Sequence, residues 1–401
     1  MFRPGLSIYI PGATAELRQL HSGLQAEPDR LRGIELTSCL IPGMNSFDYA
    51  ALEPTARLTT FLLPPPLRPS FEAGRVRALP MSYSQIARHL AALSPAVAIL
   101  HVTPPQGGFC SLGTCADFGS IVASNARRLI GVVNPALARP LETSRLPVEA
   151  FDALIELEDA PTFPAEAPPS PDLRVLANHV ANLVPDGAAV QTGIGAAPSA
   201  VWRALIGHKD LKLRSGMVTD GFLDAFDAGA MAANGHVAGV AFGSERLHER
   251  LHASDLVAFA DVRRTHGAQA LAGVKHLVAI NSAIEVDLFG QANLEWQAGK
   301  LISGAGGAPD FARAGRASSG GRSILALPAT ARQGTASRIS ARLKVPASLA
   351  RTDIDTVVTE YGVAHLTSLS MDERAEALIE IAAPSHREAL TQAWQEMKTS
   401  F

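Results

Sequence analysis

The sequence predicts an α/β protein made of two related open domains, each built on a parallel sheet. The chain has 401 residues, which is more than one hydrophobic core usually organises, so two domains are expected. Short apolar runs typical of buried strands alternate with helical stretches along the chain. Each half also opens with the same order of elements, a strand, a loop of small residues and a helix. This weak internal repeat favours two domains of one kind.

The repeat can be followed residue by residue. In the first copy the strand is 7–10 and the small-residue loop is 11–15, and in the second copy they are 188–191 and 192–198. A helix follows each loop, over 16–20 and 199–205. Further strands are predicted at 97–102, 129–133, 237–242, 256–259, 324–327 and 356–359. Further helices are predicted at 84–93 and, after a capping box at 370–373, up to residue 381.

A proline-rich segment separates the two predicted domains. Residues 160–171 contain five prolines and no apolar periodicity, which favours extended backbone over helix. Ser170, Pro171 and Asp172 then form a typical helix start, with a serine cap, a proline in the first turn and an early acid. The predicted domains are therefore 1–165 and 166–401.

Composition predicts a reduced cytosolic protein that binds neither nucleic acid nor membrane. The formal net charge is −3 and the pI is about 6.5, so no basic excess would attract nucleic acid. No apolar run approaches the roughly 20 residues that span a bilayer. Residues 1–5 lack the features of a signal or transit peptide. The three cysteines are too few for a disulfide framework.

Glu285 is the residue that points most directly to chemistry. It follows the apolar run 276–280 and lies in an alternation that predicts a strand, with Ile284, Val286 and Leu288 on one side and Glu285 and Asp287 on the other. In the middle of an α/β domain both faces of a strand are usually covered, so such carboxylates are solvated at a cleft, paired or used in a reaction. The glycine-rich loop 303–307 follows, and its backbone N–H groups could approach a ligand. A carboxylate nucleophile facing such donors suits acyl transfer, although an ion-pair role for Glu285 fits the local pattern equally well.

Two more loops follow predicted strands. The loop 192–198 joins a strand to a helix, where glycines and free N–H groups can bind an anion, but a tight turn explains the pattern as well. Pro198 replaces the last glycine of a dinucleotide fingerprint, and no P-loop lysine follows. The loop 104–113 lies at the carboxyl end of strand 97–102, where α/β sheets bind ligands. Its Cys110 has no evident base nearby, so a small buried cysteine is the better interpretation.

Residues 248–252 match the His-Glu-x-x-His pattern of zinc peptidases. On a helix both imidazoles would share one face, and Glu249 would be the base. Charged flanking residues favour a solvated helix face instead, and no third ligand is evident, although His266 and His276 follow.

Taken together, the sequence resembles the acetyl-CoA hydrolase/transferase branch of the family I coenzyme A transferases, which includes 4-hydroxybutyrate and butyryl-CoA:acetate CoA-transferases. The strongest match is Ile-Asn-Ser-Ala-Ile-Glu-Val-Asp-Leu at 280–288, with Gly-Gln at 290–291. The other matching stretches occur in family order: 102–105 with 108–113, 132–134, 191–196, 219–221, 303–307 with 310–311, 326–330, 334 with 337–339, and 357–364.

The resemblance implies two α/β domains of the NagB/RpiA/CoA-transferase-like type and a ping-pong transfer of CoA between an acyl-CoA and a carboxylic acid. It implies that Glu285 is the nucleophile and carries a glutamyl-CoA thioester. CoA would be a substrate, with no tightly bound cofactor and no metal, and the protein would be a cytoplasmic homodimer. Further residues implied to bind CoA or stabilise the oxyanion are Gly193, Ile194, Gly195, Ala196, Ala197, Ser303, Gly306 and Gly307.

One element departs from the family. Residues 214–217 are Arg-Ser-Gly-Met, where the family usually has His-Ser/Thr-Glu-Met. This change argues against a standard acetate or butyrate enzyme. The alternatives are an acyl-CoA hydrolase on the same scaffold, a non-catalytic CoA-binding relative and, from the His248–His252 pattern, a zinc peptidase.

Overall fold

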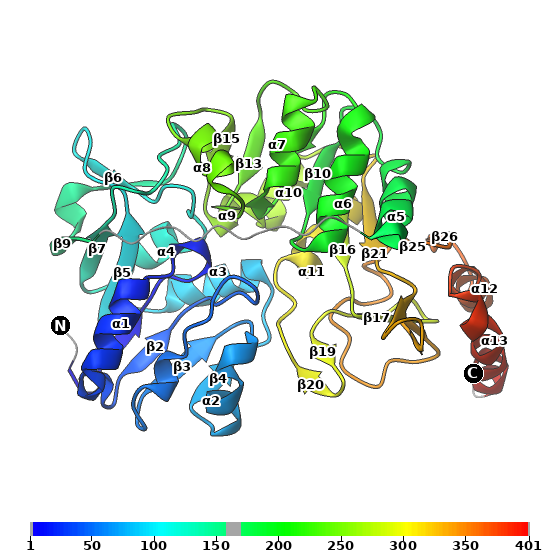
Figure 1. The fold of residues 1–401 in the computed structure, drawn as a ribbon, viewed down its shortest axis with the longest axis horizontal. Helices are drawn as coiled ribbons and strands as arrows, with labels where there is room; N and C mark the ends of the chain where they lie inside the picture. Colours follow the sequence, from blue (N-terminus) through cyan, green and yellow to red (C-terminus); the bar gives the residue numbers. More distant parts are fainter. Residues whose placement is uncertain (1–2, 158–169, 400–401) are drawn as a thin grey trace. The chain divides into compact units, whose positions relative to one another are not determined.

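The computed structural model describes residues 3–157 and 170–399 (Figure 1). The chain forms two compact units, and each is described by itself. The first unit comprises Met1–Pro164, Asn234–Gly267 and Leu301–Gly306, and the second comprises Ala165–Ala233, Ala268–Lys300 and Gly307–Phe401. The predicted boundary at residue 165 and most of the proline-rich linker lie outside the described residues.

The compact units are not continuous in sequence, in contrast to the predicted domains 1–165 and 166–401. Segment 234–267 belongs with the first unit because its backbone bonds to that unit. Ala116 N–H donates to Gly239 O at 2.9 Å, and Ala241 N–H donates to Thr114 O at 2.8 Å. Segment 301–306 is attached in the same way, since Tyr83 N–H donates to Gly306 O at 3.1 Å.

The first unit contains a seven-stranded sheet in which every neighbouring pair is parallel, in the order β4-β3-β2-β1-β5-β7-β9. Along the chain, β2, β3 and β4 are added on one side of β1, and β5, β7 and β9 are then added on the other side. The order of the strands therefore reverses between β1 and β5. The strands are β1 (Ser7–Tyr9), β2 (Glu35–Thr37), β3 (Arg57–Thr60), β4 (Val76–Ala78), β5 (Val97–Val102), β7 (Leu129–Val133) and β9 (Ala153–Glu156).

Apolar side chains of this sheet form the core of the first unit. All six residues of β5 are buried, as expected for a central parallel strand covered on both faces. Ile8, Leu36, Leu58 and Ile130 from neighbouring strands pack in one cluster. Helices of this unit include α1 (Arg18–Ala26), α3 (Tyr83–Ala92), α4 (Gly119–Ala123), α8 (Glu245–Leu251) and α9 (Val262–Thr265).

The second unit contains a six-stranded sheet in the order β11-β10-β16-β21-β25-β26. All pairs are parallel except β25 with β26. Here the order reverses between β10 and β16, so the topology repeats that of β1 and β5. The strands are β10 (Ala189–Thr192), β11 (Lys212–Leu213), β16 (Leu277–Ser282), β21 (Arg322–Ala326), β25 (Thr356–Thr359) and β26 (Gly362–His365). The prediction of two related domains with parallel sheets is confirmed.

Helices α5 and α6 lie side by side in this unit (Figure 1). The predicted helix start at Ser170 is confirmed, because its side chain accepts from Leu173 N–H at 3.3 Å. The predicted capping box at Ser370 and Glu373 is also present. The helices of the second unit include α5 (Pro171–Ala181), α6 (Ala196–Ala204), α7 (Asp220–Asp227), α11 (Ala308–Ala317), α12 (Met371–Glu380) and α13 (Pro384–Lys398).

One strand prediction needs correction. The single strand predicted at 237–242 is β13 (His236–Ala238) and β14 (Val240–Ala241), because the chain breaks at Gly239, whose carbonyl bonds to Ala116. The strand predicted at Glu285 is confirmed as β17 (Glu285–Asp287). It is the middle strand of a small sheet with β18 (Ala292–Asn293) and β24 (Ile339–Ser340), separate from the main sheet of its unit.

Among residues 3–157 and 170–399, no helix combines the length and the apolar character that crossing a bilayer requires.

Candidate functional site

Glu285 and the glycine loop 193–195 lie at the same edge of the second unit's sheet. Strands β10 and β16 are parallel neighbours, with Thr192 opposite Ile280. The glycine loop follows β10 directly, and Glu285 comes three residues after β16 ends. Both therefore leave the carboxyl ends of adjacent strands, at the point where the strand order reverses. This is the place where open α/β sheets bind ligands.

The glycine loop 193–195 has free space around its glycines, and Thr192, from which it starts, is held by hydrogen bonds. A Cβ added at Gly193 or Gly195 would meet nothing within 4 Å, and Gly195 has a φ of +108°, which favours glycine. Helix α6 begins directly after it, and no side chain caps its first N–H groups. At the base, the Trp202 indole N–H donates to Thr192 Oγ1 at 3.0 Å, and Ser215 Oγ donates to Thr192 O at 3.0 Å. The backbone of 193–197 can therefore approach an anionic ligand.

Glu285 and Asp287 lie two residues apart on β17 but differ in their environment. Asp287 is fully buried and accepts hydrogen bonds from Phe289 N, Gln291 N, Gln291 Nε2 and Leu343 N at 2.9–3.2 Å. It therefore organises the turn that follows the strand. Glu285 is half-buried, and within the described part of its unit its carboxylate has no hydrogen bond or ion pair.

The backbone beside Glu285 is held by an arginine. Arg338 Nη1 donates to Ile284 O at 3.2 Å, and its Nε donates to Thr330 O at 3.2 Å. Glu285 itself pairs with Asn293 of β18. The side chain is thus presented from a fixed backbone, as a reacting group requires.

Two amide side chains lie near the carboxyl ends of β10 and β16. Gln191 Nε2 and Asn281 Oδ1 are 3.5 Å apart, and both residues are buried. Gln191 Oε1 and Asn281 Nδ2 are buried without a hydrogen-bond partner in the described structure. Sequence analysis did not single them out, although a glutamine and an asparagine at the ends of adjacent apolar strands were a usable signal.

The loop 303–307 is divided between the two units. Gly304 packs closely in the first unit, where an added Cβ would lie 2.4 Å from Phe61 O. Ser303 Oγ donates to Gly304 O at 3.2 Å, and Gly306 has a φ of +58°. Gly307 belongs to the second unit and precedes α11, where its carbonyl accepts from Phe311 N–H. The roles predicted for Ser303, Gly306 and Gly307 stay predictions.

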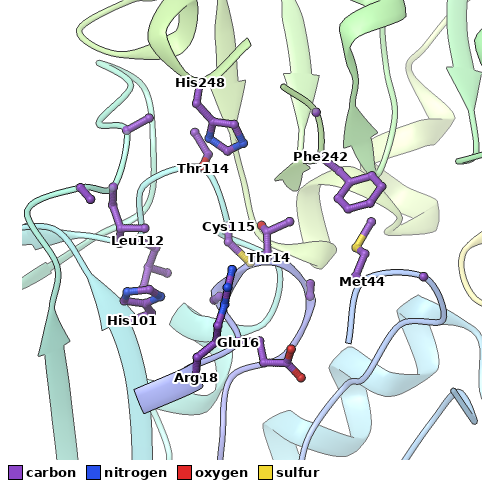
Figure 2. A pocket seen from close by; sticks show the side chains of 17 residues that line it. Thr14, Glu16, Arg18, Met44, His101, Leu112, Thr114, Cys115, Phe242 and His248 are labelled. Carbon is purple, nitrogen blue, oxygen red and sulfur yellow. The ribbon is translucent and has the colours of Figure 1, made fainter. Parts of the chain in front are cut away.

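Sequence analysis placed a candidate ligand site at the loop after β5, but it did not identify the charged residues that line the pocket found there. The pocket lies in the first unit, at the corresponding reversal of strand order (Figure 2). Its volume is about 180 Å³. Its polar lining includes Glu16, Arg18, His101 and His248.

Two motifs that the sequence analysis assigned to structural roles are Cys110 and the His-Glu-x-x-His pattern at 248–252, and their surroundings are as follows. Cys110 is buried on β6 (Phe109–Ser111), and burial raises the pKa of its thiol, which disfavours the nucleophilic thiolate. Helix α8 ends at Leu251, and His252 has extended backbone, so the two imidazoles do not share one helical face. His252 Nδ1 accepts from Arg139 N–H at 3.3 Å, whereas His248 lines the pocket. Within the described residues, no three His, Cys, Asp or Glu side chains group as metal ligands.

Comparison with known proteins identifies the family. The model of the acetyl-CoA hydrolase/transferase C-terminal domain matches residues 243–394. The chain is 31% identical to the 4-hydroxybutyrate coenzyme A transferase of Clostridium kluyveri, over 94% of this chain and 91% of that protein. The chain belongs to the acetyl-CoA hydrolase/transferase family of CoA transferases. A family member from Fasciola hepatica, a succinyl-CoA:acetate/propanoyl-CoA:succinate CoA transferase, is 30% identical over 98% of this chain and 85% of that protein.

Solved structures of similar proteins agree with this family and its fold. RipA from Yersinia pestis has a TM-score of 0.90 at 28% identity, covering 98% of this chain and 94% of that one. The 4-hydroxybutyrate CoA-transferase from Porphyromonas gingivalis has a TM-score of 0.82 at 27% identity, covering 100% and 95%. The family also contains hydrolases, since an acetyl-CoA hydrolase of Yarrowia lipolytica is 29% identical over 52% of this chain and 40% of that protein.

Proposed function

We propose that this protein moves CoA between an acyl-CoA and a carboxylic acid, with Glu285 as the nucleophile. The observation that carries the proposal is the contrast on β17. Asp287 is saturated with hydrogen bonds, whereas the half-buried Glu285 carboxylate has none within its unit. A carboxylate that no donor stabilises keeps its nucleophilicity.

The reaction has four steps that balance without ATP or a metal. The Glu285 carboxylate attacks the acyl-CoA carbonyl, the C–S bond breaks, and a mixed anhydride and CoA thiolate form. The thiolate attacks the glutamyl carbonyl, which gives a Glu285–CoA thioester and releases the first carboxylate. The acceptor carboxylate attacks that thioester and forms a second anhydride, with CoA thiolate as the leaving group. The thiolate then attacks the acyl carbonyl, which releases the new acyl-CoA and free Glu285.

In this proposal, backbone N–H groups of two loops bind CoA or stabilise the oxyanion. Gly193, Ile194, Gly195, Ala196 and Ala197 would bind CoA, because the loop is open and the first N–H groups of α6 favour anions. Ser303, Gly306 and Gly307 would bind CoA or stabilise the oxyanion, as inferred from the family resemblance. Each oxyanion donor is expected to contribute about 10²–10³ in rate.

Mass spectrometry of the intact protein tests the nucleophile. After incubation with a panel of acyl-CoA thioesters, wild type should carry a CoA adduct that maps to the Glu285 peptide. Glu285→Gln should lose the adduct and at least about 10³-fold in transfer rate. Glu360→Gln is the matched control, because Glu360 is a carboxylate of the same unit that is already engaged by Ala329 N–H. An adduct on the Glu285→Gln protein, or on another peptide, would refute the assignment.

A hydrolase is the alternative within the same chemistry, with water in place of the acceptor acid. It is distinguished by measuring CoA release with and without an acceptor acid. Without an acceptor, a transferase releases at most about one equivalent of the first carboxylate per subunit and keeps CoA as the Glu285 thioester. With an acceptor it forms a new acyl-CoA and releases no free CoA. Continuous CoA release without an acceptor would identify the hydrolase.

A specific observation favours a second candidate, a non-catalytic CoA-binding protein. Ser215 is buried against Thr192 at the base of the glycine loop, so the following residue is also close to that base. The family usually has a glutamate at that following position, and here it is Gly216. If Glu285 is not the nucleophile, wild type should bind CoA but form no adduct. Gly216→Glu in the otherwise unchanged chain would then gain a transfer activity that wild type lacks, whereas our main proposal expects wild type to be active already.

The proposal also includes a cytoplasmic homodimer without a tightly bound cofactor or metal. Light scattering of the purified full chain tests the dimer, and elemental analysis for zinc tests the metal.

A further inference from the structure

A cluster of arginines lies in the second unit, at the amino ends of β21 and β25. This is the opposite edge of the sheet from the glycine loop 193–195, which follows the carboxyl end of β10. Arg316, in the last turn of α11, donates to Asp355, the residue before β25. Asp355 Oδ2 also accepts from Ser323 N–H of β21 at 2.9 Å. The members of the arginine cluster are Arg313, Arg316, Arg342, Arg351 and Arg374.

The turn after β17 and the segment before β25 hold three of these arginines together. Arg374 Nη2 donates to Arg351 O at 3.1 Å, and Arg374 Nη1 donates to Phe289 O at 3.5 Å. The Arg342 guanidinium lies 5.5 Å from the centre of the Phe289 ring. Three segments that are distant in the chain therefore bring their cations to one place.

The arginine cluster carries more positive charge than its carboxylates neutralise. Two members are paired, one with Asp353 at 3.4 Å and one with Asp355 at 2.5 Å. In the part of the chain that the structure describes, the other three members make no ion pair, and these are Arg342, Arg351 and Arg374. The cluster thus has three cations in excess, in a protein whose formal net charge is −3.

Arg374 is the member for which this excess is least favourable. Its side chain is half-buried, and its Nε is buried without a hydrogen-bond partner among the described residues. Burial, together with the charges of Arg316 and Arg351, lowers the pKa of the Arg374 guanidinium. A half-buried cation next to like charges is stabilised by a nearby anion.

The acids next to Arg374 in the sequence are already engaged. Asp372 pairs with Lys398 at 3.0 Å, and the Glu373 carboxylate accepts from Ser370 N–H at 2.7 Å. The positions three and four residues from Arg374 hold serine, methionine, alanine and leucine, so α12 offers it no intrahelical ion pair. The counter-ion that the arginine cluster requires must therefore come from another molecule or another part of the chain.

A phosphate group matches the arginine cluster better than a carboxylate does. It carries almost two negative charges at neutral pH, and its oxygens point in several directions and can accept from more than one guanidinium group. Arginine binds such a group through two parallel N–H donors, which a lysine cannot do. Hydrogen bonds to the carbonyls of Phe289 and Arg351 need only a neutral donor, so they do not account for the charge that gathers here.

We infer that the arginine cluster binds a phosphate monoester dianion through Arg351 and Arg374, with Arg342 and Arg316 adding to the positive potential. The site lies at the edge of the sheet away from the glycine loop, and it does not depend on the transfer reaction proposed above. Free phosphate compounds and the 3′-phosphate of CoA share this chemistry, and the experiment separates the two sources.

Calorimetric titration of the full chain with inorganic phosphate, at constant ionic strength, tests the site. Arg351→Gln should lose at least about tenfold in phosphate affinity, and Arg351→Lys should keep part of it. Arg351 is exposed, so the free energy of unfolding of both variants should stay near that of wild type, as urea denaturation can verify. Arg387→Gln is the matched control, because Arg387 is a half-buried arginine of the same unit that donates to Ala382 O outside the cluster.

CoA and 3′-dephospho-CoA are then titrated into the same variants. A loss of affinity in Arg351→Gln for CoA but not for 3′-dephospho-CoA would identify the 3′-phosphate of CoA as the ligand. A loss for inorganic phosphate alone would identify a free phosphate compound. The inference is overturned if neither inorganic phosphate nor CoA binds less tightly to Arg351→Gln than to Arg387→Gln. An equal loss for CoA and 3′-dephospho-CoA, with none for inorganic phosphate, would indicate a pyrophosphate and would also overturn it.

Discussion

The two points where strand order reverses share a topology and differ in how the chain fills them. At β1/β5 the loop after the first strand packs against its neighbours, and an added Cβ at Gly12 would lie 2.0 Å from Cys39 O. At β10/β16 the corresponding loop is open, and an added Cβ at Gly193 meets nothing within 4 Å. The first reversal point encloses a small pocket of charged side chains, and the second presents backbone N–H groups and one carboxylate.

This difference shows that one topology can shape its point of strand reversal in two ways. At β1/β5 the chain forms a pocket whose lining includes Arg18 and Glu16. An open loop at a helix start suits a large, flexible anion such as CoA, which it can contact through the backbone. The glycines of the two loops therefore serve different purposes, close packing at Gly12 and ligand access at Gly193.

The largest difference in stability is expected between the alanine variants of Gly12 and Gly193. Gly12→Ala should destabilise the protein by more than about 4 kcal/mol, because the backbone carbonyl of Cys39 must move to admit the methyl group. Gly193→Ala should stay within about 0.5 kcal/mol of wild type. Urea denaturation measures both. Since the Gly193 methyl group would occupy ligand space, CoA affinity of that variant should fall while its stability does not.

Equal stability of the two variants would contradict the comparison of the loops. Gly207→Ala is the matched control, because an added Cβ meets nothing within 4 Å there and φ is not positive, as at Gly12 and Gly193. Its stability should stay within about 0.5 kcal/mol of wild type.

The groups beneath the two reversal points also differ. Fully buried Asp117 lies in the first unit, whereas the neutral amides Gln191 and Asn281 lie in the second. Burial, helped by the charge of Asp261, raises the pKa of Asp117 from 3.8 to about 7. The folded state therefore binds this proton more tightly, so the stabilisation is fully present below pH 3.8 and is lost as the pH rises through 7. The shift corresponds to at most about 4 kcal/mol.

Asp117→Asn should remove this dependence. The free energy of unfolding of wild type should fall between pH 4 and pH 7.5, and that of the variant should fall distinctly less. Denaturation at several pH values measures the difference. Parallel curves for the two proteins would show that Asp117 is not protonated in the fold.

The two carboxylates of β17, Glu285 and Asp287, should differ less in their contribution to the free energy of unfolding. Asp287→Ala should cost about 3 kcal/mol, because three half-buried backbone N–H groups lose their acceptor. Glu285→Ala should change stability by no more than about 0.5 kcal/mol, because no hydrogen bond is lost within its unit. Thermal and urea denaturation measure both. A large loss of stability in Glu285→Ala would mean that Glu285 is structural.

The sequence predicted those parts of the fold that local patterns determine. Strands 97–102, 129–133 and 356–359 have the predicted bounds, because each is a short apolar run buried on both faces. Sequence could not assign segment 234–267 to the first unit, since the bonds from Thr114 and Ala116 to that segment join residues more than 100 positions apart. Asp287 and Glu285 occupy the same face of one strand, and only the turn after β17 distinguishes their roles.

The lining of the pocket in the first unit could not be predicted from the sequence, because its residues come from segments that are far apart in the chain. Glu16 and Arg18 lie on one segment, and His101 lies near the end of a strand. His248 lies in the His-Glu-x-x-His pattern, which the sequence analysis assigned to a solvated helix face. Their proximity depends on β1 and β5 being neighbours, which a linear pattern does not contain. Burial, which changes the acidity of Glu16, is likewise a property of the folded unit.

The smallest expected effect on stability concerns Glu16, which lines the pocket of the first unit. Burial raises the pKa of Glu16 from 4.5 to about 7, so the folded state binds this proton more tightly than the unfolded chain does. The stabilisation from this proton is therefore fully present below pH 4.5 and is lost as the pH rises through 7. Because Glu16 is only half-buried, its contribution should be smaller than that of Asp117. Glu16→Gln should make the free energy of unfolding less dependent on pH in this range, which denaturation at several pH values measures. An unchanged pH dependence in Glu16→Gln would show that Glu16 is ionised in the folded protein.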